Sequence, residues 1–273
     1  VNAGNSITSG GNYNTVVGDE AGTAITTGDE NTFVGYQSGD GTTTATRNSA
    51  LGAYALGDNT TGANNVAVGR QALKFNTTAS NNTALGYHAL QVNTTGAANV
   101  AVGHTSLDAN TTGSYNVAVG GETLSDVTTG SFNTGVGDGA GANITTASDN
   151  SAFGAGSLLT NTTGASNTAI GKNALRANTT GGNNTAVGYE SLLDNTTGAQ
   201  NTSVGFRSLF NNTTASNNVA VGQDALYTNT TGANNVALGH SALTANTTAS
   251  NNVAVGYSAG TAVTTGERNT VVG

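Results

Sequence analysis

A glycine returns every 17 residues along this chain, without a single insertion or deletion. With this glycine as position 1, a typical unit reads G-x-x-A-L-x-x-N-T-T-G-A-N-N-V-A-V. A period this short cannot hold the two helices of a helical-array repeat, whereas it suits one turn of a β-solenoid. The sequence therefore predicts an all-β fold, a parallel β-solenoid (β-roll) of sixteen 17-residue coils, with 1–273 as a single tandem-repeat domain. The units end at Gly18, Gly35, Gly52, Gly69, Gly86, Gly103, Gly120, Gly137, Gly154, Gly171, Gly188, Gly205, Gly222, Gly239, Gly256 and Gly273.

The composition also favours stacked repeats over a conventional globular core. Charged residues make up 8%, 40 residues are Gly, and Pro, Cys, Met and Trp are absent. A chain so poor in bulky apolar residues is either disordered or stabilised by its neighbouring repeats. Position 5 is usually Leu and position 8 Asn, but Gly22 is matched by Ile25 and Gly260 by Val263. This exchange of volume predicts a packed interior and argues against disorder.

Position 14 is Asn in every unit. In a solenoid equivalent residues stack, so these amides should form a ladder that donates to and accepts from adjacent coils. A row of ligand-binding amides is the alternative, and we favour the structural ladder because a ligand rarely needs sixteen identical contacts. The predicted ladder consists of Asn14, Asn31, Asn48, Asn65, Asn82, Asn99, Asn116, Asn133, Asn150, Asn167, Asn184, Asn201, Asn218, Asn235, Asn252 and Asn269.

The positions around this asparagine predict the strands. Positions 14 to 17, for example 65–68, read as one strand, with positions 15 and 17 on one face and position 16 on the other. Position 17 is apolar in every unit, as in Leu51 and Phe153, so we expect it to form the core. The following Gly should turn the corner with a positive φ. A second strand is expected at positions 8 to 10, the Asn-Thr-Thr of 76–78.

Two features of the unit leave alternatives open. Position 16 is Ala in eleven units although Ala is a poor strand residue. Either another chain approaches there around a common axis, or the coil interior is too thin for a larger side chain. Asn-Thr-Thr is also an N-glycosylation sequence, at Asn59, Asn76 and Asn93 among others. We favour stacking over glycosylation there.

Positions 2, 3, 6 and 7 vary and should face solvent. The histidines His88, His104 and His240 lie at such positions with no matching acid or nucleophile, and the carboxylates do not follow a calcium-repeat spacing. We therefore predict no enzyme activity, no metal and no cofactor. Aromatic residues at position 2 are possible surface-binding residues that could stack on sugar rings, or else fill grooves between coils or chains. They are Tyr36, Tyr87, Tyr189, Phe206 and Tyr257.

The stretch Asn-Val-Ala-Val-Gly-Tyr-Ser-Ala at 252–259, and its counterpart at 167–174, resembles the head repeats of YadA-like trimeric autotransporter adhesins. The longer unit with Asn-Thr-Thr-Gly resembles repeats of bacterial and phage tail-fibre-like proteins. The resemblance implies a left-handed solenoid, a homotrimer, and an extracellular place on a cell surface or virion appendage. The adhesin heads differ in using a shorter repeat.

These observations predict a structural or adhesive extracellular fibre segment, a rigid shaft or head within a longer fibrous protein. Its partners would be further copies of itself and a host glycan or matrix component. A net charge of −8 argues against nucleic acid, and no apolar run reaches the roughly 20 residues of a membrane helix. End-to-end assembly into a filament or surface layer is an alternative, since the chain begins and ends within the repeat pattern. Ice binding is a second alternative, disfavoured because only one of two adjacent Thr can face outward.

Overall fold

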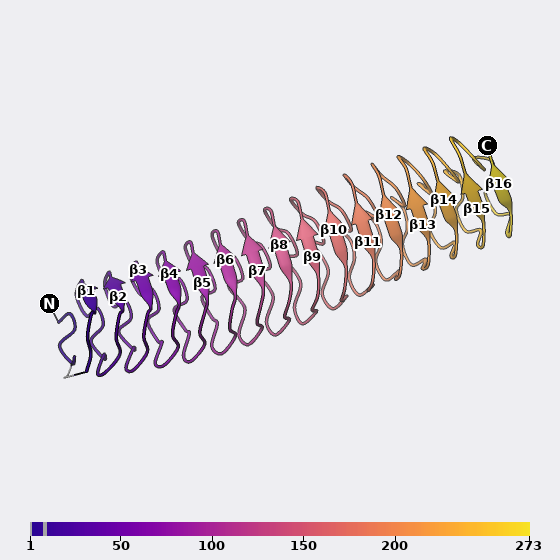
Figure 1. Ribbon diagram of the computed structural model, residues 1–273. Coiled ribbons are helices and arrows are strands. Elements are labelled where there is room, and N and C mark those ends of the chain that lie inside the picture. The colour runs from indigo at the N-terminus through magenta and orange to yellow at the C-terminus, as the bar shows by residue number, and fades with distance from the viewer. Residues whose placement is uncertain (1, 8–9) are drawn as a thin grey trace. The chain divides into compact units, whose positions relative to one another are not determined.

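The computed structural model describes residues 2–7 and 10–273 and confirms the predicted fold class (Figure 1). The described chain is all-β and contains no helix; its sixteen parallel strands, 17 residues apart, belong to a β-solenoid of about fifteen turns. The strands are β1 (Thr15–Val17), β2 (Thr32–Val34), β3 (Ser49–Leu51), β4 (Val66–Val68), β5 (Thr83–Leu85), β6 (Val100–Val102), β7 (Val117–Val119), β8 (Thr134–Val136), β9 (Ser151–Phe153), β10 (Thr168–Ile170), β11 (Thr185–Val187), β12 (Thr202–Val204), β13 (Val219–Val221), β14 (Val236–Leu238), β15 (Val253–Val255) and β16 (Thr270–Val272).

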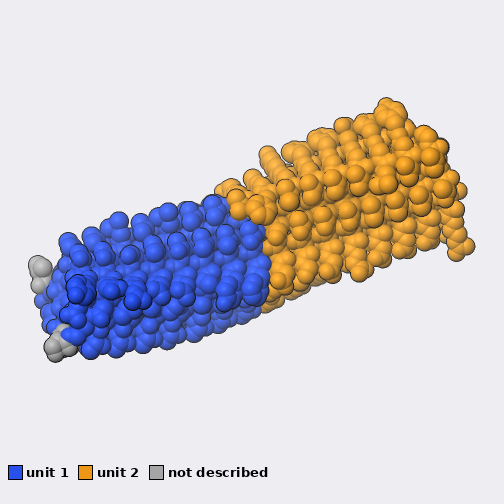
Figure 2. Space-filling view, in the orientation of Figure 1, with its two compact units in different colours: residues 1–135 blue, residues 136–273 orange. Residues whose placement is uncertain are grey.

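The chain divides into two compact units, Val1–Gly135 and Val136–Gly273, with the boundary inside β8 (Figure 2). In the first unit β1 to β7 pair in sequence order, and in the second β9 to β16 do the same. Each residue pairs with the one 17 positions later, as in Val66 with Thr83. Equivalent residues of successive coils therefore stack within each unit.

Each strand covers only positions 15 to 17, one residue fewer than predicted. The Asn at position 14 precedes it, and the Gly at position 1 follows it with a φ between 123° and 143° in the sixteen copies. Residues that carry a side chain rarely adopt a φ in this range, so the corner favours Gly. The predicted turn with a positive φ is confirmed. A Cβ added to Gly103 would lie 2.2 Å from the carbonyl oxygen of Gly120. The close approach of successive coils thus also requires Gly.

The prediction that position 17 forms the core is wrong. The alternation along the strand is as expected, but position 16 points inward and position 17 outward: Ala84 is fully buried whereas Leu85 is 45% exposed. Leu side chains at position 5 and Asn side chains at positions 8 and 14 already fill the interior, as Leu90, Asn93 and Asn99 show. Little more than a methyl group fits between them. The thin interior therefore accounts for the Ala column, which does not contact another chain.

The second predicted strand is also wrong wherever the structure describes it, since each described coil contains one strand; its first copy, at 8–10, lies partly outside the described residues. At positions 9 and 10 the amides of two consecutive residues, Thr60 and Thr61, both donate to the carbonyl of Thr77, at 2.8 and 3.3 Å. An extended strand alternates its donors between opposite sides, so this shared acceptor requires a bend.

The interior confirms the predicted exchange of volume. Leu at position 5 adopts a positive φ, 52° in Leu107, and Gly replaces it in a few coils. A Cβ added to Gly22 would lie 2.9 Å from Cδ1 of Ile25, so the larger residue occupies the space that Leu fills elsewhere. Position 16 takes part in the exchange as well. Phe33 stands at position 16, and a Cβ added to Gly39, at position 5 of the next coil, would lie 2.5 Å from its ring.

Candidate functional site

The charged residues are segregated onto part of each coil. Of the fifteen acidic and seven basic residues, sixteen lie at positions 2, 3, 6 and 7, and the other six at positions 12 and 13. None lies at positions 9, 10, 15 or 17. We call the outward side chains of positions 15 and 17 the strand face, and those of positions 2, 3, 6 and 7 the variable face. The two faces are the candidate functional surfaces.

The strand face is uncharged and rich in apolar side chains in both units. Position 17 is Val, Leu, Ile or Phe throughout, and position 15 is Thr, Val or Ser. Single exposed apolar residues are ordinary, but a contiguous row of them marks an interaction surface. The large apolar side chains exposed on it are Val17, Leu51, Val66, Leu85 and Val119 in the first unit, and Phe153, Ile170, Val221, Leu238, Val253, Val255 and Val272 in the second.

The asparagines of position 14 hold successive coils together. The Asn82 Oδ1 atom accepts the backbone amide of Asn99 at 2.9 Å, and Asn99 Nδ2 donates to the carbonyl of Gly113 at 2.9 Å. The ladder therefore joins side chains mainly to the backbone of the next coil. Fourteen of the sixteen side chains are buried, and Asn14 and Asn269 are partly exposed. Buried amides bonded in this way are not presented to a ligand.

A second ladder lies at position 8, in agreement with the preference for stacking over glycosylation at Asn-Thr-Thr. Asn76 Nδ2 donates to Asn59 Oδ1 at 2.8 Å and to the carbonyl of Ala79 at 2.9 Å, so here amide bonds to amide. The regular Asn-Thr-Thr was the signal, but it was interpreted as a strand. An N-linked glycan would need an exposed Nδ2, and the folded coils bury it. The ladder consists of Asn59, Asn76, Asn93 and Asn110 in the first unit, and Asn161, Asn178, Asn195, Asn212, Asn229 and Asn246 in the second.

The five predicted surface aromatics are all exposed on the variable face. They stack on rings of adjacent coils: Tyr189 on Phe206 at 5.6 Å, and Tyr257 on His240 at 5.2 Å between ring centroids. Tyr87 stacks on His88 of its own coil and on His104 of the next, and Tyr36 meets Tyr54 of the next coil edge to face. Each ring thus fills space between coils and also keeps a surface open to solvent.

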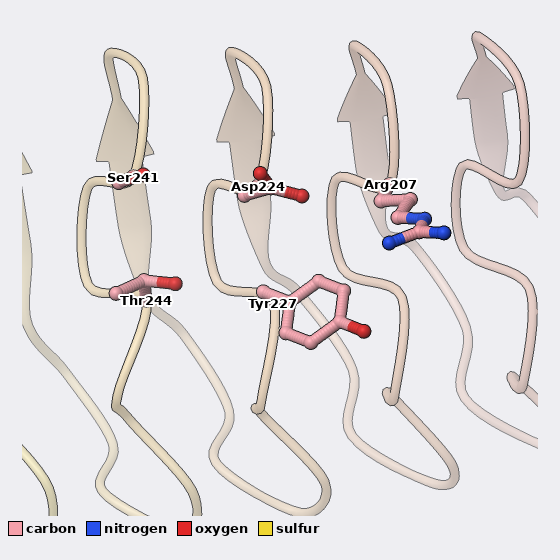
Figure 3. Close-up of a pocket in the computed structure, with 5 residues that line it drawn as sticks. All are labelled: Arg207, Asp224, Tyr227, Ser241 and Thr244. Atoms are coloured by element: carbon pink, nitrogen blue, oxygen red, sulfur yellow. The ribbon is translucent and has the colours of Figure 1, made fainter.

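A depression of about 220 Å³ lies on the variable face of the second unit (Figure 3). It is lined by Arg207, Asp224 and Ser241 at position 3 of three successive coils and by Tyr227 and Thr244 at position 6. A second depression on the same unit is lined by Thr160, Arg176, Ala177, Leu193 and Asp194. The sequence did not reveal either depression, because each combines variable positions of successive coils.

Burial is the main cause of a shifted pKa at four groups of the variable face. Burial raises the pKa of the Asp40, Asp108 and Asp194 carboxyls, and neighbouring carboxylates raise it further. Burial and the Arg70 charge lower the pKa of His88. Among residues 2–7 and 10–273 no three His, Asp or Glu side chains lie close enough together to hold a metal ion. No helix long and apolar enough to cross a membrane occurs in the same residues.

No model of a known protein family matches the chain, and no curated protein matches it. The similarity to YadA-like head repeats therefore stays a prediction that rests on the residues quoted above.

Proposed function

We propose that this chain is a structural segment of an extracellular fibre in which several copies, most simply three, pack side by side through their strand faces. The observation that supports it best is the uncharged, apolar strand face that both units carry. Burying apolar surface stabilises an assembly by about 25 cal/mol per Å². A row of exposed Val, Leu, Ile and Phe side chains therefore favours association.

Another copy of the chain suits this face for two reasons. The strand face repeats at the spacing of neighbouring strands, about 4.8 Å, and a second copy repeats at the same spacing, so one favourable contact recurs at every coil. The chain has a net charge of −8, and all of its charged residues lie off the strand face. Copies packed through it keep their like charges on the outside. This is the arrangement of a fibre shaft.

Ice binding is a second candidate, and the strand face gives it a specific basis. Positions 15 and 17 form an outward pair separated by the inward position 16, and position 15 is Thr in eight of the sixteen strands. The objection that the adjacent Thr of Asn-Thr-Thr cannot both face outward does not apply to this pair. Leu and Phe at position 17 make the face less regular than an ice surface requires, so we place self-association first.

Light scattering coupled to size exclusion, with small-angle X-ray scattering, tests the proposal. We expect about three times the mass of one chain. The paired substitutions Val102→Glu and Val119→Glu place charges on the strand face and should return the mass to that of one chain. The matched pair Ala98→Glu and Tyr115→Glu changes position 13 of the same coils, where Glu30 already stands, and should leave the assembly intact.

A wild-type protein with the mass of a single chain at micromolar concentration would contradict the proposal. If that monomer also lowered the freezing point of water below its melting point, the ice-binding candidate would replace it. Particles that lengthen with concentration would support end-to-end filaments instead of lateral packing.

A further inference from the structure

We propose that the depression around Tyr227 is a binding subsite for a neutral pyranose sugar, one residue of a glycan. The inference concerns the variable face of the second unit and does not depend on the oligomeric state of the fibre. Nothing in the solenoid itself requires these side chains, because positions 3 and 6 hold different residues in other coils.

The platform of this subsite is the ring of Tyr227, the last member of a short aromatic stack. Phe210 and Tyr227 occupy position 6 of successive coils, with ring centroids 5.2 Å apart and an interplanar angle of 19°. In the next coil position 6 is Thr244, whose small side chain ends the stack. The Tyr227 ring therefore borders an open depression. A pyranose ring has a flat C–H face that packs against the electron-rich face of an aromatic ring.

The polar groups around the ring match the hydroxyl groups of a sugar. The Arg207 guanidinium only donates hydrogen bonds, the Asp224 carboxylate only accepts them, and the hydroxyls of Ser241 and Thr244 do both. In Figure 3 the carboxylate of Asp224 points toward the Arg207 side of the depression, above the Tyr227 ring. A sugar hydroxyl is both donor and acceptor, so neighbouring hydroxyls could use both kinds of group.

Arg207 is held in place before any ligand arrives. Its Nε lies 3.3 Å from Glu190 Oε2, and its guanidinium carbon lies 5.0 Å from the Phe206 ring centroid and 5.6 Å from that of Phe210. The carboxylate of Asp224 accepts a hydrogen bond from Gln223 Nε2 at 3.2 Å. Groups already ordered lose less conformational entropy on binding, which favours affinity.

The charge balance selects a neutral ligand. Arg207 is paired with Glu190, and Asp224, which accepts a hydrogen bond from the neutral amide of Gln223, adds a second carboxylate that lines the depression. An acidic sugar would bring a further negative charge beside Asp224 in a chain of net charge −8. We therefore expect a neutral hexose and not a uronic or sialic acid.

Saturation-transfer difference NMR on the full chain tests the subsite. The probes are the methyl glycosides of β-D-glucose, β-D-galactose and α-D-mannose, with D-glucuronate for comparison. We expect at least one neutral glycoside to bind, with the strongest transfer to its ring C–H protons. Tyr227→Ala and Asp224→Asn should each weaken binding at least tenfold, whereas Tyr227→Phe should keep it.

Tyr87→Ala is the matched control, because Tyr87 is an exposed aromatic that does not line the depression, and this variant should bind like the wild type. Circular dichroism of every variant checks that the solenoid is intact. Three results would overturn the inference: no neutral glycoside binds, D-glucuronate binds more tightly than all three, or Tyr87→Ala weakens binding as much as Tyr227→Ala.

Discussion

At the scale of single residues, the glycine of position 1 is the most constrained site in the repeat. Gly103 has a φ of 136° and lies against the carbonyl of Gly120, so Gly103→Ala combines an unfavourable backbone conformation with a steric clash. We expect the free energy of unfolding to fall by about 3 kcal/mol. Gly57→Ala is the control, because the nearest atom to an added Cβ lies 3.4 Å away. Thermal melts followed by circular dichroism would show the difference, and equal melting temperatures would contradict it.

The Asn ladder makes a prediction that depends on pH. Asn99→Asp keeps the acceptor for the next coil but places a carboxylate oxygen against the carbonyl of Gly113, 2.9 Å away in the wild type. Only the protonated acid can donate to that carbonyl, so the folded state should raise the pKa of the new carboxyl above the usual 3.9 or so. The protonated carboxyl stabilises the folded state fully at pH values below about 3.9. This stabilisation is lost as the pH rises through the raised pKa.

We therefore expect N99D to unfold more easily than the wild type at pH 7, by about 1–3 kcal/mol, and to approach it near pH 3. Denaturant titrations at both pH values measure this difference. Asn64→Asp, at the exposed position 13, should show no such pH dependence. A constant difference between N99D and the wild type across this range would mean that Nδ2 of Asn99 contributes little to the ladder.

At the scale of one coil, the interior has room for either a large residue at position 16 or one at position 5. Phe33 at position 16 is accommodated because Gly39 stands six residues later. Ala101 and Leu107 are the equivalent pair in the usual coil. Ala101→Phe should therefore destabilise the protein by about 3 kcal/mol, the upper end for overpacking, whereas Val102→Phe on the strand face should be nearly neutral.

Adding Leu107→Gly to Ala101→Phe should restore part of the lost stability. The double-mutant cycle, measured by denaturant unfolding, should give a favourable coupling of at least about 1 kcal/mol. Strict additivity of the two substitutions would show that positions 16 and 5 do not share one space.

The architecture of a single coil shows how far the sequence predicts the structure. The period, the parallel strands, the corner glycine and the exchange between Gly22 and Ile25 follow from stacking and excluded volume. Alternation alone cannot say which side of a three-residue strand faces inward. The answer depends on what else fills the coil, and the buried Asn at position 8 was not recognised. Apolar position 17 was therefore predicted to face inward, although in the usual coil, with Leu at position 5, the inward side of the strand has room for little more than Ala. The depression at Tyr227 depends on which side chains adjacent coils bring together, which no single repeat contains.

At the scale of the whole chain, stability should be a sum over coils and over the contacts between neighbouring coils. Nearly all of the described hydrogen bonds between coils join residues 14 to 18 apart, and therefore neighbouring coils, as Asn99 with Gly113 and Thr77 with Thr94. Removing one complete 17-residue repeat should then leave the contacts between all other neighbouring coils intact and bring the two flanking coils together in the same register. Deletion of residues 86–102 joins Leu85 to Gly103 and preserves the phase of the repeat.

We expect this 17-residue deletion to keep the circular dichroism per residue and to lower the melting temperature only slightly. Deletion of 86–101 removes one residue fewer and leaves Val102 as an extra residue before Gly103. The coil at the junction then has to bulge, or the Asn ladders and the column of position-1 glycines lose their alignment there. The 16-residue deletion should therefore melt well below the 17-residue one. If the two deletion variants had the same melting temperature, the coupling between neighbouring coils would not depend on the phase of the repeat.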